Sequence, residues 1–132
     1  MAAKVLDSYA LMAFFEDEPG ADFVRSLIHK AVENDTTLLM SIVNLGEIWY
    51  SIARNNSPEL ADQYVNEIRG MGIEIVDVDW VVTRQAAVYK AGGNISYADC
   101  FAAALAKLKK AELVTGDKEF KQLEDEIKIS WL

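Results

Sequence analysis

Cysteine and histidine are nearly absent from the 132-residue chain, and their scarcity excludes several kinds of site. The single cysteine, Cys100, rules out an internal disulfide and a zinc site built from several thiolates. We expect it to be a small buried hydrophobic residue. The single histidine, His29, rules out any mechanism that needs two histidines. A Ser-His-Asp or Cys-His arrangement would have to use His29, and no supporting motif surrounds it.

Positive charge is also scarce, because 13 lysines and arginines face 21 acidic residues and leave a formal net charge of −8. This balance argues against a broad basic surface for nucleic acid, although an enzyme could still act on nucleic acid at one acidic pocket. Long apolar runs are missing as well. No segment approaches the length of a transmembrane helix, and Asp7 interrupts the stretch 5–15 that could be mistaken for a secretory signal. We therefore expect a cytoplasmic protein with no membrane partner.

The chain does contain a regular alternation of short apolar strands and amphipathic helices. Its length predicts a single domain, residues 1–132, that buries roughly two thirds of the surface of its unfolded chain. Pro19 is expected to open the second helix, and Trp49, Trp80 and Trp131 are expected to be core or interface anchors. The predicted strands are 4–7, 37–40, 73–78, 112–114 and 127–131, and the predicted helices are 8–15, 21–34, 42–54, 59–69, 80–91, 96–110 and 118–123. This alternation favours an α/β fold with a mainly parallel sheet of about five strands.

Four acidic residues stand apart in this pattern: Asp7, Glu47, Asp99 and Asp117. Asp7 and Asp117 follow apolar strands, and Asp99 lies at the head of a helix. Each of these three, taken singly, could simply cap a helix by accepting backbone N–H bonds. However, the carboxyl ends of parallel strands share one edge of the sheet, so the acids are expected to crowd together there. Two unit charges about 4 Å apart repel by roughly 4 kcal/mol at an effective dielectric constant of about 20, so such a cluster should bind a proton or a cation.

Glu47 lies too deep in its helix to serve as a cap. Asn44 lies one turn before it and Ser51 one turn after it, so a polar seam runs along an otherwise apolar helix. Together with the strand-end acids, this seam favours a metal site. Ligands that are all oxygen, with no histidine or cysteine among them, match Mg²⁺ or Mn²⁺. Because such ions polarise phosphoryl oxygens and activate water, hydrolysis of a phosphodiester is the reaction that this chemistry fits.

An ordered set of motifs makes the sequence recognisable. The motifs are Val5-Leu6-Asp7-Ser8, Asn44-Leu45-Gly46-Glu47, Ile95-Ser96-Tyr97-Ala98-Asp99 followed by Phe101-Ala102-Ala103-Ala104, and Val114-Thr115-Gly116-Asp117 with Phe120. Each motif is weak alone, but the ordered set is specific and spans nearly the whole chain. In this set the sequence resembles the PIN-domain nucleases and, within them, the VapC-type toxins of bacterial and archaeal toxin–antitoxin modules.

The resemblance implies a three-layer α/β/α sandwich and a Mg²⁺- or Mn²⁺-dependent endoribonuclease. It also implies an RNA substrate, a cognate antitoxin that holds the enzyme inactive, and a homodimer. The acids that match Asp7 and Asp99 are the principal metal ligands in the family. Those that match Glu47 and Asp117 complete the catalytic pocket.

The same resemblance implies residues that support the carboxylates. The hydroxyl group that matches Thr115 supports the site through hydrogen bonds, and we expect Asn44 and Ser8 to act in a similar way. One departure from the family pattern is Tyr9, which stands where many members carry Ser or Asn. The hydrogen-bond network beside Asp7 is therefore expected to differ from theirs.

Two other classes of function compete with this interpretation. A phospho-receiver signalling domain also gathers acids and Mg²⁺ at strand ends, but it needs paired acids after its first strand, and here Ser8 follows Asp7. A phosphatase with an Asp-x-Asp nucleophile fails for a similar reason at Tyr9. The remaining alternative is a non-catalytic PIN-like module that binds RNA or protein. The intact set of acids argues against it.

Overall fold

One parallel sheet organises the computed structural model, which describes residues 2–33 and 35–132. Its five strands lie in the order β3-β2-β1-β4-β5, and every neighbouring pair is parallel. The strands are β1 (Ala2–Leu6), β2 (Thr36–Ser41), β3 (Ile73–Val76), β4 (Glu112–Thr115) and β5 (Ile129–Trp131). The helices are α1 (Ser8–Phe15), α2 (Ala21–Val32), α3 (Ile42–Asn55), α4 (Pro58–Arg69), α5 (Trp80–Gly92), α6 (Tyr97–Lys109) and the 3₁₀ helix η1 (Lys118–Leu123). The predicted α/β fold with a five-stranded parallel sheet is confirmed.

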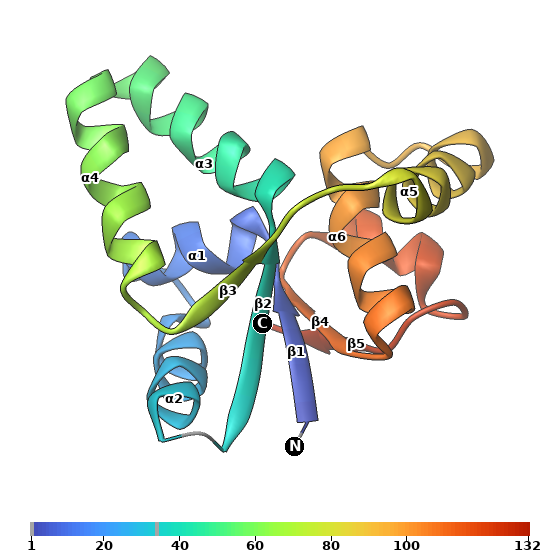
Figure 1. Cartoon of the computed structure of the whole chain (residues 1–132), viewed down its shortest axis with the longest axis horizontal. Coiled ribbons are helices and arrows are strands. Elements are labelled where there is room, and N and C mark those ends of the chain that lie inside the picture. The colour runs from blue at the N-terminus through green and yellow to red at the C-terminus, as the bar shows by residue number, and fades with distance from the viewer. Residues whose placement is uncertain (1, 34) are drawn as a thin grey trace.

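Successive residues of the central strands point to opposite faces of the sheet and fill two separate cores. Val5 of β1 and Leu113 of β4, which pair in register, belong to the core on the side of α5 and α6. Leu6 and Val114, the next pair in register, belong to the core on the side of α1 to α4. Figure 1 shows the resulting arrangement, with α1 to α4 covering one face and α5, α6 and η1 covering the other. The molecule is thus a three-layer α/β/α sandwich.

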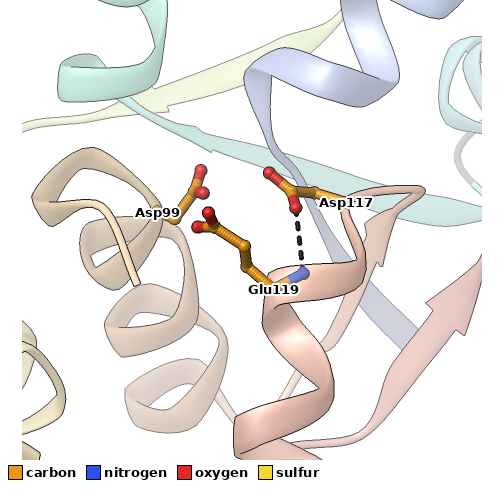
Figure 2. Close-up of side chains that lie close together, drawn as sticks. All are labelled: Asp99, Asp117 and Glu119. Carbon is orange, nitrogen blue, oxygen red and sulfur yellow. Dashed lines mark hydrogen bonds between the residues drawn. The ribbon is translucent and has the colours of Figure 1, made fainter. Parts of the chain in front are cut away.

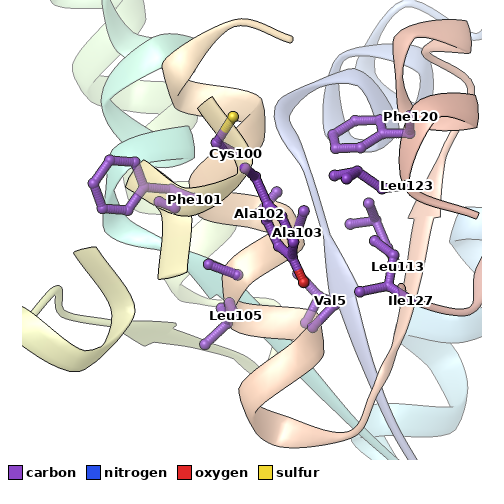
Figure 3. Close-up of a cluster of buried hydrophobic side chains, with 14 of the residues drawn as sticks. Val5, Cys100, Phe101, Ala102, Ala103, Leu105, Leu113, Phe120, Leu123 and Ile127 are labelled. Atoms are coloured by element: carbon purple, nitrogen blue, oxygen red, sulfur yellow. The ribbon is translucent and has the colours of Figure 1, made fainter. Parts of the chain in front are cut away.

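Helix α6 is the most deeply buried helix of this arrangement. Every residue from Asp99 to Ala106 is buried, and four of them are alanines whose small side chains allow the helix to lie close to the sheet. Figure 3 shows this side of the core, where side chains of α6 face Val5 and Leu113 of the sheet and Phe120 and Leu123 of η1. Cys100 lies in the same core with no exposed surface, as expected. Among the helices of the described residues, none has the length and apolar character needed to cross a membrane.

Several local predictions were wrong at the ends of elements. Helix α2 begins at Ala21 after Gly20, which has a φ of +97°, so Pro19 lies in the preceding turn and does not open the helix. The predicted end of this helix, Asn34, lies outside the described residues. Strand β5 begins at Ile129, two residues later than predicted. The predicted helix 118–123 is wound as a 3₁₀ helix.

The tryptophans were expected to anchor the core or an interface, and the structure places none of the three in the core. Trp80 is 71% exposed, and Trp49 and Trp131 are each 37% exposed. The indole N–H of Trp49 donates to Asp62 Oδ1 on α4, and that of Trp131 donates to Glu124 Oε2. These two rings therefore lie on the edges of the packed faces, where their polar atoms reach acidic partners near the surface.

Candidate active site

Three of the predicted acids lie at helix starts on the carboxyl edge of the sheet. Asp7 follows β1 and caps α1, because its Oδ1 accepts a 2.9 Å hydrogen bond from the backbone N–H of Ala10. Asp117 follows β4 and caps η1, with its Oδ1 accepting from the N–H of Glu119 at 3.0 Å. Asp99 lies in the first turn of α6. Capping thus accounts for the local position of Asp7 and Asp117, and strand topology brings these two caps to one edge.

The fourth acid, Glu47, lies on α3 and faces the same place. Glu47, Asp99 and Asp117 line one hollow of about 380 Å³. Asp7 is almost completely buried, with 1% of its surface exposed, and its carboxylate is close enough to those of Glu47 and Asp117 to be repelled by both. The structure therefore brings the four sequence-predicted acids into one region from β1, α3, α6 and the end of β4, with three of them lining the hollow and Asp7 buried near them. Of the four, only Asp99 and Asp117 belong to the tightest group of carboxylates among the described residues.

Thr115 connects the two strand-end acids. Its hydroxyl donates a 2.6 Å hydrogen bond to Asp7 Oδ2. The hydroxyl oxygen, Thr115 Oγ1, also accepts a 3.0 Å hydrogen bond from the backbone N–H of Asp117. Thr115 itself is fully buried. Tyr9, the departure from the family pattern, has its ring against Gly116. The donors to Asp7 are therefore Thr115 and the backbone of α1.

Ser8 and Asn44 hold Glu47 in place. The Ser8 hydroxyl donates to Glu47 Oε1 at 2.8 Å, and Asn44 Nδ2 donates to the same oxygen at 3.0 Å. Asn44 Nδ2 also donates to the carbonyl of Ala98 at 3.2 Å, which ties α3 to the start of α6. Both bonds to Glu47 use Oε1, so Oε2 stays outside this network. Asn44 Oδ1 is buried and, among the described residues, has no hydrogen-bond partner.

Glu119 is an acid of this cluster that the sequence reasoning missed. One carboxylate oxygen from each of Asp99, Asp117 and Glu119 can be chosen so that all three lie within 4.8 Å of one another. Figure 2 shows the three side chains converging, Asp99 from α6, Glu119 from η1 and Asp117 from the loop just before η1. The available signal was the spacing Asp117-Lys118-Glu119 at a helix start. Asp117 caps the 3₁₀ helix η1, and Glu119 lies in the first turn of this helix.

The crowding of acids alters their protonation. Burial, followed by the lesser repulsion of Asp117 and Glu47, raises the pKa of Asp7 from 3.8 to about 7, although the bonds from Thr115 and Ala10 oppose the rise. Burial and then the charges of Asp117, Asp7 and Glu47 raise the pKa of Asp99 from 3.8 to about 8. Among the described residues that line the hollow, none is a lysine or an arginine. The site therefore crowds carboxyl groups together, with no lysine or arginine among the described lining residues to stabilise their charged forms.

Comparisons with known proteins agree with this fold. The family model of the PIN domain matches residues 4–126. A comparison with curated protein sequences found no match. Among solved structures, VapBC2 from Rickettsia felis, bound to a DNA fragment from its promoter, is similar with a TM-score of 0.77 and 20% identity over 98% of both chains.

Two similar structures come from Mycobacterium tuberculosis. VapC20, described as a toxin that cleaves the sarcin–ricin loop, has a TM-score of 0.70 and 14% identity over 90% of this chain and 93% of its own. VapBC-5, of the VapBC family of toxin–antitoxin systems, has a TM-score of 0.63 and 18% identity over 100% of this chain and 98% of its own. At these low identities, the TM-scores show similarity of fold alone. Because the family model covers most of the sequence, the chain belongs to the PIN domain family.

Proposed function

We propose that the protein is a metal-dependent endoribonuclease that hydrolyses RNA phosphodiester bonds as the toxin of a toxin–antitoxin pair. The observation that carries the proposal is the convergence of four acids from distant parts of a PIN-domain chain: Glu47, Asp99 and Asp117 line one open hollow, and Asp7 is buried close enough to interact with their charges. Asp7 comes from the end of β1, Glu47 from α3, Asp99 from α6 and Asp117 from the end of β4. Capping alone accounts for Asp7 and Asp117, but it does not account for Glu47 inside a helix.

The residues of the hollow fit a hard divalent cation such as Mg²⁺ or Mn²⁺. They offer carboxylate oxygens, which these ions prefer. Burial and mutual repulsion make the charged forms of Asp7 and Asp99 unfavourable, which a nearby positive ion would reverse. A bound divalent ion supplies Lewis acidity toward the phosphodiester and a water molecule of lowered pKa.

The residues would divide this work between binding and support. Asp7, Asp99, Glu47 and Asp117 would hold the metal, with Glu119 as a further carboxylate of the same cluster. Each of their supporting contacts fixes one carboxylate before the ion arrives, so little reorganisation is needed on binding.

Three residues provide that support. Thr115 orients Asp7, while Ser8 and Asn44 orient Glu47. Asn44 also fixes the start of α6, where Asp99 lies, through the carbonyl of Ala98. Substitution of these three residues should therefore weaken metal binding without removing a metal ligand.

The proposed partners are an RNA substrate, a cognate antitoxin and a second copy of the chain. The similarity in fold to the VapBC proteins of R. felis and M. tuberculosis supports the antitoxin, and the similarity to VapC20, a sarcin–ricin loop cleaving toxin, supports RNA. A gene for a short DNA-binding protein directly upstream would be the expected source of the antitoxin. Co-expression and co-purification of the two gene products would test this association.

The decisive experiment measures cleavage of a fluorescent RNA mixture by the purified protein with Mg²⁺, with Mn²⁺ and with EDTA. We expect cleavage with either ion and none with EDTA. Asp99→Asn should abolish it because this change removes a charged ligand while preserving side-chain size. Circular dichroism and the thermal midpoint should show that the variant remains folded.

A matched control guards against contaminating nucleases and general charge effects. Asp125→Asn makes the same chemical change at an exposed position in the turn after η1, so this variant should cleave at the wild-type rate. Cleavage by the Asp99→Asn protein prepared in the same way would reject the assignment of the active site. Absence of cleavage of every RNA by the wild-type protein would favour the non-catalytic alternative.

A further inference from the structure

The hollow must bind RNA without a lysine or arginine among the described residues that line it. Proteins usually bind the phosphate backbone through such cations, and the whole chain carries a formal charge of −8. A metal ion can hold one or two phosphate oxygens, but it does not hold the neighbouring nucleotides. Other side chains around the hollow must therefore supply the remaining contacts with the substrate.

Two half-exposed tyrosines line the hollow beside the carboxylates. Tyr9 on α1 is 43% exposed, and Tyr50 on α3 is 49% exposed. Tyr50 lies three residues after Glu47, so the two side chains occupy the same side of α3. Large aromatic rings left half in water next to a catalytic pocket are unusual for a core role, and they are well suited to contact a ligand.

The ring of Tyr9 packs against the backbone of Gly116. A Cβ atom placed on Gly116 would lie 2.3 Å from Tyr9 Cε1 and 2.8 Å from Cζ, so the ring occupies the space that a side chain at position 116 would need. Gly116 stands between Thr115, which bonds Asp7, and Asp117 of the acidic cluster. The ring is thus held directly beside the groups proposed to act on the phosphodiester.

The ring of Tyr50 is in contact with a positively charged side chain, that of Arg54. The guanidinium carbon of Arg54, one turn later on α3, lies 5.4 Å from the centroid of the Tyr50 ring. Arg54 lies over the Tyr50 ring, and about half of the surface of Tyr50 remains exposed to a ligand in the hollow. This arrangement also places a positive charge next to the hollow, within one helical turn of the tyrosine.

We infer that Tyr9 and Tyr50 are base-stacking residues that bind unpaired nucleobases next to the cleaved phosphodiester, and that Arg54 contacts a neighbouring phosphate. This inference rests on the proposed ribonuclease function. Stacking is possible only for bases whose faces are free, so the tyrosines favour single-stranded segments or loops over a continuous duplex. Because every base has an aromatic face, the two rings hold the strand in place with little dependence on sequence.

Binding measurements on a cleavage-deficient protein separate this role from catalysis. The probe is a fluorescein-labelled 12-nucleotide single-stranded RNA of mixed sequence, measured by anisotropy with the Asp99→Asn protein in Mn²⁺. Adding Tyr9→Leu or Tyr50→Leu should weaken binding by roughly 5- to 150-fold for each ring, the range expected for loss of one stacked base. Tyr9→Phe and Tyr50→Phe keep the ring and should bind within about twofold of the parent.

Two further controls test whether the effect belongs to the hollow. Trp80→Leu removes a more exposed aromatic ring, from α5, that does not line the hollow, and it should leave binding unchanged. A duplex of the same sequence should bind more weakly than the single strand, and the leucine variants should lose little of that weaker binding. In the cleaving protein, the leucine variants should raise KM more than they lower kcat, because stacking contributes mainly to binding.

Several results would overturn the inference. Leucine variants that bind within twofold of the parent would show that the rings do not stack on bases, and equal losses in the phenylalanine variants would assign the effect to the hydroxyl groups. Loss of antitoxin binding with unchanged RNA binding would make the surface a protein-docking site. These failures differ from failure of the proposed function, in which the wild-type protein cuts no RNA. Because both tyrosines are half exposed, thermal midpoints near that of the parent are expected for all these variants.

Discussion

The hydroxyl of Thr115 donates a 2.6 Å hydrogen bond to Asp7 Oδ2, although the two residues are 108 positions apart in the chain. The bond joins the end of β4 to the end of β1, two strands that are neighbours in the sheet. Thr115 also accepts from the N–H of Asp117, so one buried oxygen positions two of the clustered acids. Sheet pairing and the geometry of the site are therefore linked at this residue.

Thr115→Val should lower both stability and activity. The change keeps the shape of the side chain but leaves Asp7 Oδ2 without this donor, which costs roughly 1–3 kcal/mol for a buried acceptor. In the wild-type protein the hydrogen bond from Thr115 lowers the pKa of Asp7. Valine removes this bond, so the pKa of Asp7 should rise further and metal binding near neutral pH should weaken. Urea denaturation and the cleavage rate measure the two effects. Thr115→Ser keeps the hydroxyl and should retain most of both properties; equal losses in serine and valine would contradict the role of the bond.

The metal-free protein should lose stability as the pH rises from about 4 to about 8. In this range the folded state keeps protons on Asp7 and Asp99, whose pKa values are about 7 and about 8, whereas the unfolded state has released them near 3.8. Stability falls with pH wherever the folded state holds more protons. For Asp7 the difference corresponds to at most roughly 4 kcal/mol.

Denaturation with EDTA at pH 5 and at pH 8 tests this dependence. The midpoint should be higher at pH 5, and Asp7→Asn should reduce the difference because asparagine does not titrate. Added Mn²⁺ should raise the midpoint most at pH 8, since a cation favours the charged carboxylates. A midpoint that is equal or higher at pH 8 in EDTA would show that the buried acids do not titrate in this way.

Glu119→Gln should weaken Mn²⁺ binding by about tenfold, because it removes one charge from the group that Asp99 and Asp117 complete. Isothermal titration calorimetry measures this affinity directly. Glu67→Gln makes the same change at an exposed position on α4 and should bind as the wild type does. If both variants bind alike, Glu119 is a surface residue of the cluster and not a ligand.

The sequence was sufficient to predict how the strand-end acids would meet. Parallel strands have a common carboxyl edge, so Asp7 and Asp117 could be placed together once β1 and β4 were predicted. Glu47 was predictable because an acid inside an apolar helix needs polar neighbours, and Asn44 supplied the signal. These predictions succeeded because the periodicity of strands and helices fixes which residues share an edge or a face.

Glu119 and Trp49 could not be placed by the same rules. Glu119 stands in a charged segment that is typical of solvated surface, and its position near Asp99 depends on how η1 packs against α6, which periodicity does not predict. Trp49 lies at the edge of the apolar stripe of α3, where burial depends on the neighbouring helix. There its indole N–H reaches Asp62 on α4. Both cases depend on packing between elements, which a single sequence does not contain.

Gly116→Ala should be destabilising only while Tyr9 is present. The new Cβ would lie 2.3 Å from Tyr9 Cε1, so the ring would have to move away from position 116. This displacement should lower the free energy of unfolding by about 1–2 kcal/mol. In a Tyr9→Ala background the same space is empty, and alanine at position 116 should be neutral or stabilising by up to about 1 kcal/mol, because it restricts the unfolded chain. A double-mutant cycle by urea denaturation measures this coupling. Gly46→Ala is the matched control, since nothing lies within 4 Å of a Cβ at that position in α3, and it should stabilise the protein with or without Tyr9. Additive effects of Gly116→Ala and Tyr9→Ala would mean that the ring does not rest on Gly116, and the stacking role of Tyr9 would lose the contact that holds its ring in place.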